Sequence, residues 1–170
     1  TTVAVDTARQ ATHPDDDPPM IVTTDPEAAR TADPLPALSI VIPAFNEEAF
    51  IGTLLEQILA VDLSRFGVGR EILVVDDCSR DRTAEIAGAV PGVTVIRQPV
   101  NGGKGLAVRA GIARATGDYL IIQDADLEYD PRDYLPMLEV LLSGRADAVY
   151  GSRYLPDPAS GVLYNLAKGR

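Results

Sequence analysis

Residues 38–150 alternate between apolar runs of strand length and stretches with helical spacing. The runs predict strands at Leu38–Pro43, Glu71–Asp76, Val93–Arg97, Asp118–Gln123 and Ala146–Tyr150. The stretches between them predict helices at about 50–59, 82–89, 106–115 and 131–142. Such alternation is typical of an α/β fold with a mostly parallel central sheet and right-handed crossovers. We therefore expect a Rossmann-like three-layer sandwich.

Charge and proline content separate the first 37 residues from the rest. The chain has 170 residues and a net charge of −10, and residues 1–37 hold seven acidic and two basic side chains. Six of the thirteen prolines also lie there. This segment has no sustained apolar period, so we expect residues 1–37 to be a disordered acidic tail. The negative charge argues against nucleic acid as a partner.

Targeting signals and disulfides are not indicated by the sequence. The first residues lack the basic start and apolar core of a signal peptide. No apolar run reaches the roughly 20 residues of a membrane-spanning helix. Cys78 is the only cysteine, so no intrachain disulfide can form, which is consistent with a cytoplasmic protein.

Polar clusters follow the predicted strands. Because ligands of open α/β sheets bind beyond the carboxyl ends of the strands, these clusters should converge on one rim. The loop after the first strand contains Asn46, which we expect to cap the following helix. The clusters are Asn46-Glu47, Asp76-Asp77, Gly102-Gly103-Lys104, Asp124 to Glu128, and Arg153.

Three carboxylates follow the fourth strand at alternating positions, Asp124, Asp126 and Glu128. An extended backbone would place all three on one face, where they would repel one another. A hard divalent cation such as Mg²⁺ or Mn²⁺ would relieve that repulsion. A solvated acidic turn is the other interpretation.

Three further clusters suit parts of a nucleotide. Asp76 or Asp77 could accept hydrogen bonds from a base or ribose, or could simply lie near a helix N-terminus. Lys104, set between glycines, could hold a phosphate together with backbone N–H groups, although a glycine turn with a solvated lysine explains it equally well. Arg153 could make a bidentate phosphate contact or be an ordinary surface arginine.

In this order, the motifs resemble those of family 2 glycosyltransferases with the GT-A fold. The nearest resemblance is to the polyprenyl-phosphate (dolichyl-phosphate) mannose or glucose synthases, and it covers residues 38–155. The segments that carry it are Ser39 to Glu48, Val74 to Ser79, Asn101 to Gly105, Asp124 to Glu128, and Gly151 to Tyr154.

The resemblance implies a role for each matching position. The nucleoside would be held by Pro43, Phe45, Glu47 and Asp77. Asp124 and Asp126 match the DxD pair that meets the ribose, the diphosphate and the metal, and Glu128 would complete the metal site. Lys104 and Arg153 match basic residues near the sugar nucleotide and its phosphates. Phe45 stands where tyrosine is common and Cys78 where glycine is common, so the base assignment is weakened.

The implied activity is an inverting transfer from a nucleotide-diphosphate sugar, of the GDP-mannose or UDP-glucose type. Asp126 and Arg153 would be the catalytic residues, and Mg²⁺ or Mn²⁺ the cofactor. The expected acceptor is polyprenyl phosphate, at the cytosolic face of a membrane that the protein contacts peripherally. A lipid phosphate is already anionic, and the sequence offers no convincing base to activate a sugar hydroxyl.

Other interpretations stay open. Members of this family continue past the last motif, so we expect residues 156–170 to begin a truncated acceptor-side segment. The chain could then be a non-catalytic nucleotide-sugar-binding module. It could also be a transferase acting on a saccharide hydroxyl. A nucleotidyltransferase is disfavoured, because Pro43 to Glu47 is not the glycine- and arginine-rich loop that such an enzyme needs after its first strand.

Overall fold

A single seven-stranded sheet organises the chain in the computed structural model, which describes residues 3–6, 35–151 and 165–166. The strand order is β4-β3-β2-β5-β1-β6-β7. The strands are β1 (Val3–Asp6), β2 (Ala37–Ala44), β3 (Gly69–Asp76), β4 (Val93–Arg97), β5 (Tyr119–Ile122), β6 (Ala148–Tyr150) and β7 (Asn165–Leu166). The helices are α1 (Ile51–Ala60), α2 (Thr83–Gly88), α3 (Lys104–Ile112) and α4 (Tyr134–Leu142), with 3₁₀ turns η2 (Ser64–Phe66) and η3 (Pro131–Asp133).

Four neighbouring strands, β4, β3, β2 and β5, run parallel. In register, Ile40 of β2 lies between Ile72 of β3 and Ile121 of β5. The predicted α/β class with a mostly parallel sheet is confirmed, and all five predicted strands are present. Because the four strands share one direction, their carboxyl ends meet at the same rim of the sheet.

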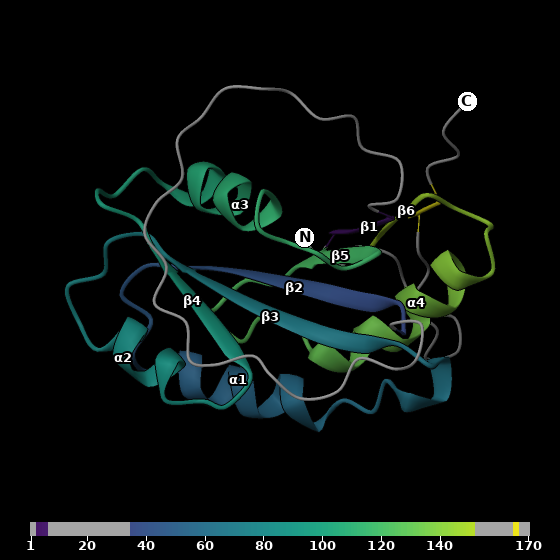
Figure 1. Ribbon diagram of the computed structural model, residues 1–170, viewed down its shortest axis with the longest axis horizontal. Coiled ribbons are helices and arrows are strands. Elements are labelled where there is room, and N and C mark those ends of the chain that lie inside the picture. The colour runs from purple at the N-terminus through teal and green to yellow at the C-terminus, as the bar shows by residue number, and fades with distance from the viewer. Residues whose placement is uncertain (1–2, 7–34, 152–164, 167–170) are drawn as a thin grey trace.

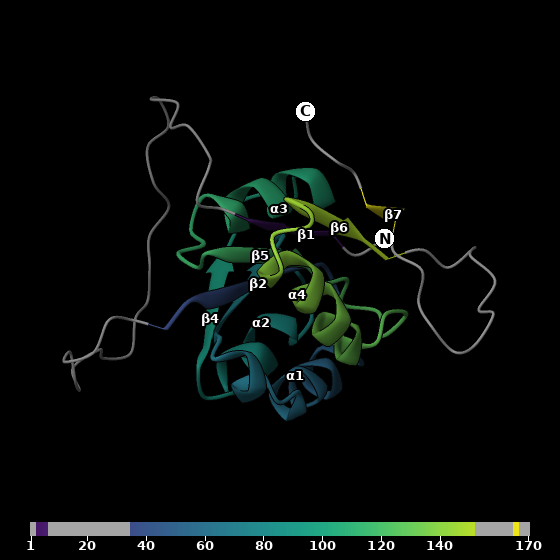
Figure 2. The ribbon, with the colours of Figure 1, turned by 90° about the vertical axis from the view of Figure 1, so that its right-hand side faces the viewer.

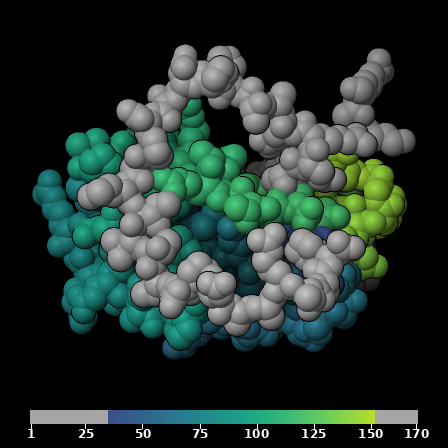
Figure 3. Space-filling view, in the orientation of Figure 1, coloured from purple at the N-terminus to yellow at the C-terminus, as the bar shows by residue number. Residues whose placement is uncertain are grey.

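Helices cover both faces of the sheet. Figures 1 and 2 show α3 on one face and α1, α2 and α4 on the other, which gives the three layers expected. Figure 3 shows α4 and β6, in yellow-green, at the opposite end of the molecule from the teal residues of α2 and β4. None of the described helices is both long and apolar enough to cross a membrane.

Successive side chains of β2 point to opposite faces of the sheet, so the hydrophobic core has one part on each face. Ile40 and Ile42 belong to the larger cluster, with the buried side chains of α1 and α4. Val41 points to the other face and packs with Ala107 of α3. On that face α3 approaches closely, because a Cβ added at Gly111 would lie 2.3 Å from Val41 Cγ1. This close packing fixes the position of α3 over the parallel strands.

The prediction of a disordered tail is wrong for Val3–Asp6, which form β1. This strand pairs antiparallel with β5 on one side and with β6 on the other. Without it, β5 and β6 would present edges with unpaired backbone groups. Residues 7–34 lie outside the described part of the chain. In the segment predicted as the start of an acceptor side, residues 165–166 form β7 beside β6, and the others also lie outside it.

Asn46 does not cap α1, contrary to the sequence prediction. The helix begins at Ile51, with Phe50 at the N-cap position. Asn46 has a positive φ of 57°, its backbone N–H donates to Ser79 Oγ, and its Oδ1 accepts from the Arg80 N–H. These bonds tie the loop after β2 to the loop after β3, so two loops of the rim are braced against each other.

Candidate functional site

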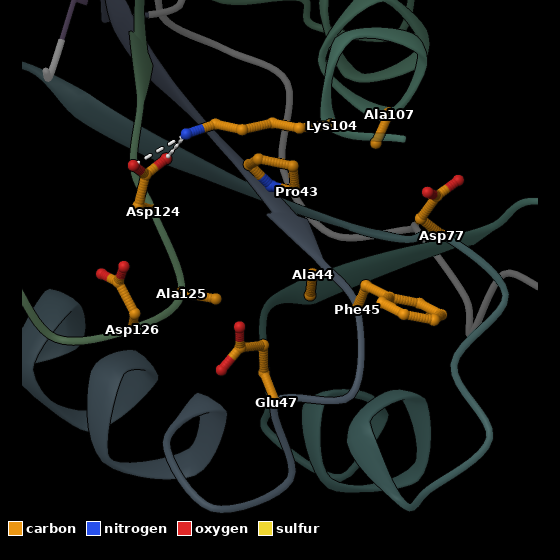
Figure 4. A pocket seen from close by; sticks show the side chains of 10 residues that line it. All are labelled: Pro43, Ala44, Phe45, Glu47, Asp77, Lys104, Ala107, Asp124, Ala125 and Asp126. Carbon is orange, nitrogen blue, oxygen red and sulfur yellow. Dashed lines mark hydrogen bonds and ion pairs between the residues drawn. The ribbon is translucent and has the colours of Figure 1, made fainter. Parts of the chain in front are cut away.

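A pocket lies at the carboxyl ends of β2 and β5, beside the start of α3 (Figure 4). Seven of the residues predicted from the sequence line it together. They are Pro43, Phe45, Glu47, Asp77, Lys104, Asp124 and Asp126. Three alanines, Ala44, Ala107 and Ala125, complete the lining. The convergence of the strand ends has therefore brought separate motifs into one pocket.

Lys104 and Asp124 form an ion pair across the pocket. Lys104 Nζ lies 2.7 Å from Asp124 Oδ1 and 2.8 Å from Oδ2. The Asp124 side chain is only 18% exposed, whereas that of Lys104 is 62% exposed. Lys104 is the first residue of α3, so its ammonium group and the positive end of the helix lie at the same side of the pocket. An anion could therefore be held here.

Asp77 fixes the glycine turn that precedes Lys104. Its Oδ1 accepts from the Gly102 N–H at 2.9 Å, and its Oδ2 accepts from the Gly103 N–H at 2.7 Å. Asn101 Nδ2 also donates to the Asp77 carbonyl oxygen. Gly103 has a φ of 82°, which favours glycine at this position. Asp77 therefore positions Lys104 through the loop between them.

Glu47 and Asp126 face the same part of the pocket (Figure 4). Burial raises the pKa of Glu47, and the negative charges of Asp126 and Asp81 raise it further. The backbone N–H of Glu47 donates to Thr83 Oγ1 at 2.8 Å, which anchors the residue to the start of α2. The excess negative charge at this end of the pocket would attract a cation.

The chain turns after β5, and the expected extended run of carboxylates is wrong. β5 ends at Ile122, residues 125 and 126 form a turn, and Leu127 has a φ of 60°. Glu128 is consequently not among the pocket residues, and its N–H donates to Asp126 Oδ1. Within the described residues, no group of three or more acidic, histidine or cysteine side chains is arranged to hold a metal. Asp124 and Asp126 remain in the pocket as a pair.

Comparison with known proteins decides the family. The model of glycosyl transferase family 2 matches residues 39–166. The chain belongs to glycosyl transferase family 2. The resemblance inferred from the motifs is therefore confirmed.

Two curated family members illustrate the similarity. The low-salt glycan biosynthesis hexosyltransferase Agl6 of Haloferax volcanii is 40% identical over 124 residues, which are 72% of this chain and 29% of the relative. The dolichol-phosphate mannosyltransferase of Pyrococcus furiosus is 36% identical over 121 residues, 69% of this chain and 33% of the relative. The chain thus spans about a third of the length of these proteins.

A solved structure supports the GT-A fold. The glucosyl-3-phosphoglycerate synthase of Mycobacterium tuberculosis, crystallised with Mn²⁺, UDP and glucosyl-3-phosphoglycerate, superposes with a TM-score of 0.54 at 30% identity. The match covers 64% of this chain and 40% of the synthase.

Among the described residues, Asp76 is a second predicted site residue, after Glu128, that does not line the pocket. Asp76 is fully buried, where its carboxylate accepts from Arg97 Nε at 3.0 Å and from the Ser79 N–H at 3.2 Å. These partners hold Asp76 in the sheet and away from the pocket lining, and its predicted contact with a nucleotide stays a prediction. Arg153 lies outside the described residues, and its predicted role as a catalytic phosphate ligand stays a prediction.

Sequence reasoning missed a buried hydrogen-bonded pair whose glutamine bonds to the loop that carries Asp124 and Asp126. Gln123 and Tyr134 are both buried and hydrogen bonded to each other. A glutamine at the end of an apolar strand was the available signal, because a buried polar side chain needs partners.

Proposed function

We propose that this chain binds the nucleotide-diphosphate sugar of an inverting glycosyltransferase reaction. The observation that carries the proposal is the pocket itself. It combines an exposed aromatic ring, a lysine at a helix N-terminus and two carboxylates at the rim of a parallel sheet. These groups match the three parts of such a donor, which are a base, a diphosphate and its cation.

The two ends of the pocket suit different parts of the donor. Phe45 is 44% exposed and its ring lies toward Asp77, away from Asp124 and Asp126 (Figure 4). A flat apolar ring suits stacking against a base, and Pro43 extends the apolar surface. Lys104 and the first turn of α3 suit the diphosphate. We assign the nucleoside to the Phe45 end and the phosphates to the Lys104 end.

The carboxylates fit a divalent cation. Asp124 and Asp126 provide the hard oxygen ligands that Mg²⁺ and Mn²⁺ prefer, and Mg²⁺ usually takes only one or two carboxylates plus phosphate oxygens. Burial raises the pKa of Glu47, and the negative charges of Asp126 and Asp81 raise it further, so a cation at this end would be favoured. Mn²⁺ in the Mycobacterium synthase supports the same choice. When bound, the cation would neutralise charge on the departing diphosphate.

The chain's own residues would orient the donor and help its departure. Lys104 would donate to a phosphate oxygen and stabilise the negative charge that develops there. Asp77 would keep Lys104 in place through Gly102 and Gly103.

A lipid phosphate is the acceptor that we propose. The Pyrococcus relative is a dolichol-phosphate mannosyltransferase, which supports a polyprenyl phosphate here. Such an acceptor carries its second negative charge above a pH of about 6, so no protein base is needed. The lipid would bring the reaction to the cytosolic face of a membrane, where the protein would bind peripherally.

Calorimetry with UDP and GDP tests the donor assignment. We expect binding that requires Mn²⁺ or Mg²⁺ and is lost in Asp126→Ala, with a strong reduction in Asp124→Ala. Asp118→Ala is the control, because Asp118 bonds the Ala37 N–H at the opposite end of β5. Unchanged affinity in both pocket variants would refute the donor site.

Transfer assays test the acceptor. With radiolabelled GDP-mannose or UDP-glucose, transfer to polyprenyl phosphate should not vary above about pH 7, because the second phosphate ionisation is then complete. Transfer to a saccharide hydroxyl alone would contradict the lipid assignment. Donor binding without any transfer would instead support a nucleotide-sugar-binding module.

A further inference from the structure

A buried glutamine directly precedes the pocket residue Asp124 and is hydrogen bonded to a buried tyrosine. Gln123 is fully buried, and Tyr134 at the start of α4 is 1% exposed. The Tyr134 hydroxyl donates to Gln123 Oε1 at 2.8 Å. Burial raises the pKa of the Tyr134 hydroxyl well above its usual value, so the group stays protonated and able to donate. Neither side chain lines the pocket.

The amide of Gln123 bridges the two ends of the loop that carries the pocket carboxylates. Its Nε2 donates to the Asp124 carbonyl oxygen at 3.0 Å and to the Tyr129 carbonyl oxygen at 3.4 Å. The backbone N–H of Gln123 continues the sheet by donating to the Val41 carbonyl oxygen. The residue is therefore fixed to the rigid sheet through its backbone and to the loop through its side chain.

The bond from Tyr134 determines which way the amide points. Because the hydroxyl donates to Oε1, the Nε2 group must face the two carbonyl oxygens of the loop. The loop needs such support, since Leu127 within it has a positive φ of 60°, which is rare for a residue with a branched side chain. Burying an amide and a phenol costs free energy that leucine and phenylalanine would not, so the pair calls for a reason beyond packing.

We propose that Gln123 and Tyr134 are positioning residues that hold Asp124 and Asp126 in the geometry needed for a divalent cation and a diphosphate. This inference rests on the proposed function of the pocket. The pair acts from outside the pocket, through the backbone of residues 124–129. Outer groups that orient metal ligands commonly change metal affinity by roughly 10- to 100-fold when removed.

The experiment compares Gln123→Met, Tyr134→Phe and the double variant. Tyr134→Phe leaves Gln123 Oε1 without its donor, and Gln123→Met leaves the Tyr134 hydroxyl and two loop carbonyl oxygens without their partner, so both should lower the thermal midpoint. The double variant removes the unpaired hydroxyl, so it should be more stable than Gln123→Met. Binding of UDP and of GDP with Mn²⁺ should nevertheless remain roughly 10- to 100-fold weaker in Gln123→Met and in the double variant.

Hydrogen exchange of the metal-free protein provides a readout that does not depend on binding. Amides of residues 125–129 should exchange faster in Gln123→Met and the double variant, while those of β2 and β3 keep their protection. Ser39→Ala is the matched control, because it removes a buried hydroxyl that bonds Glu71 and the Gly117 N–H at the opposite rim. It should lower the thermal midpoint without changing exchange at 125–129 or nucleotide binding.

The outcomes separate this inference from the proposed function. The first outcome is that the wild-type protein binds UDP or GDP with Mn²⁺, and that the double variant shows the same nucleotide affinity and the same hydrogen exchange at 125–129. That result would overturn the positioning role and leave the donor site intact. A wild-type protein that binds neither nucleotide with Mn²⁺ would overturn the donor site instead. In that case, faster exchange at 125–129 would still show that Gln123 orders the loop.

Discussion

Replacing Lys104 by methionine should change cation binding and nucleotide binding in opposite directions. In the structure, the ammonium group lies 2.7 Å from Asp124 Oδ1 and competes with any cation for that carboxylate. Methionine keeps an apolar stem of similar length but removes the charge. Asp124 would then be available to Mn²⁺ without first breaking an ion pair.

The sizes of the two effects follow from the exposure of the pair. Exposed ion pairs contribute roughly 0.2–1 kcal/mol, and the burial of Asp124 places this one near the upper end, at about 1 kcal/mol. Mn²⁺ alone should therefore bind about fivefold more tightly. A charge-assisted hydrogen bond to phosphate contributes roughly 1.5–3 kcal/mol. In saturating Mn²⁺ the ion pair is already broken in both proteins, so UDP binding should be roughly 10- to 160-fold weaker in Lys104→Met.

Two titrations check this pair of expectations. Mn²⁺ binding without nucleotide can be followed by electron paramagnetic resonance, and UDP binding in excess Mn²⁺ by calorimetry. Arg109→Met is the control, since Arg109 is an exposed residue of the same helix that does not line the pocket. If Mn²⁺ alone binds Lys104→Met no better than wild type, the reasoning about competition for Asp124 is wrong.

Three further predictions concern charge, packing and the third carboxylate. Asp126→Asn should stabilise the metal-free protein by less than about 1 kcal/mol at neutral pH, because the charge of Asp126 helps to raise the pKa of Glu47. The gain should disappear as the pH falls below that raised pKa and Glu47 becomes neutral, which urea unfolding from about pH 8 to about pH 4 would detect. Gly111→Ala should cost roughly 1–3 kcal/mol of unfolding free energy through overlap with a β2 valine, whereas Gly105→Ala on the same helix, with no atom within 4 Å of the added Cβ, should be neutral or stabilising. Glu128→Gln should change Mn²⁺-dependent UDP binding by less than about twofold, because Glu128 does not line the pocket and an amide oxygen can still ligate; a loss as large as that of Asp126→Ala would refute this.

The sequence predicted the features that depend on strand direction. Once β2, β3 and β5 are recognised as parallel, Phe45, Asp77 and Asp124 must meet at one rim, because each follows the carboxyl end of a strand. Seven pocket residues could therefore be named without coordinates. Asp76 and Asp77 show what the sequence could not predict. Successive residues along a strand point in opposite directions, and the sequence does not say which of the two faces the pocket.

The features that were missed depend on partners distant in sequence. β1 forms because two strand edges more than a hundred residues away need pairing, and the composition of residues 1–37 obscured its four residues. Gln123 and Tyr134 are likewise explained only by each other and by the loop that they hold. Leu127 reverses the chain at a place where alternation alone predicts an extended strand.

The position of β1 has a consequence for the order in which this domain is completed during synthesis. Val3–Asp6 precede every other described strand, yet their partners, Tyr119–Ile122 and Ala148–Tyr150, follow more than a hundred residues later. The four parallel strands and α1 to α3 are all available before β6 exists. β1 can therefore cover the edge of β5 as soon as that strand is made, and β6 then joins the sheet against β1. Until β1 pairs there, the nascent chain carries an open sheet edge at β5, which is where a chaperone or a second chain would find unpaired backbone groups.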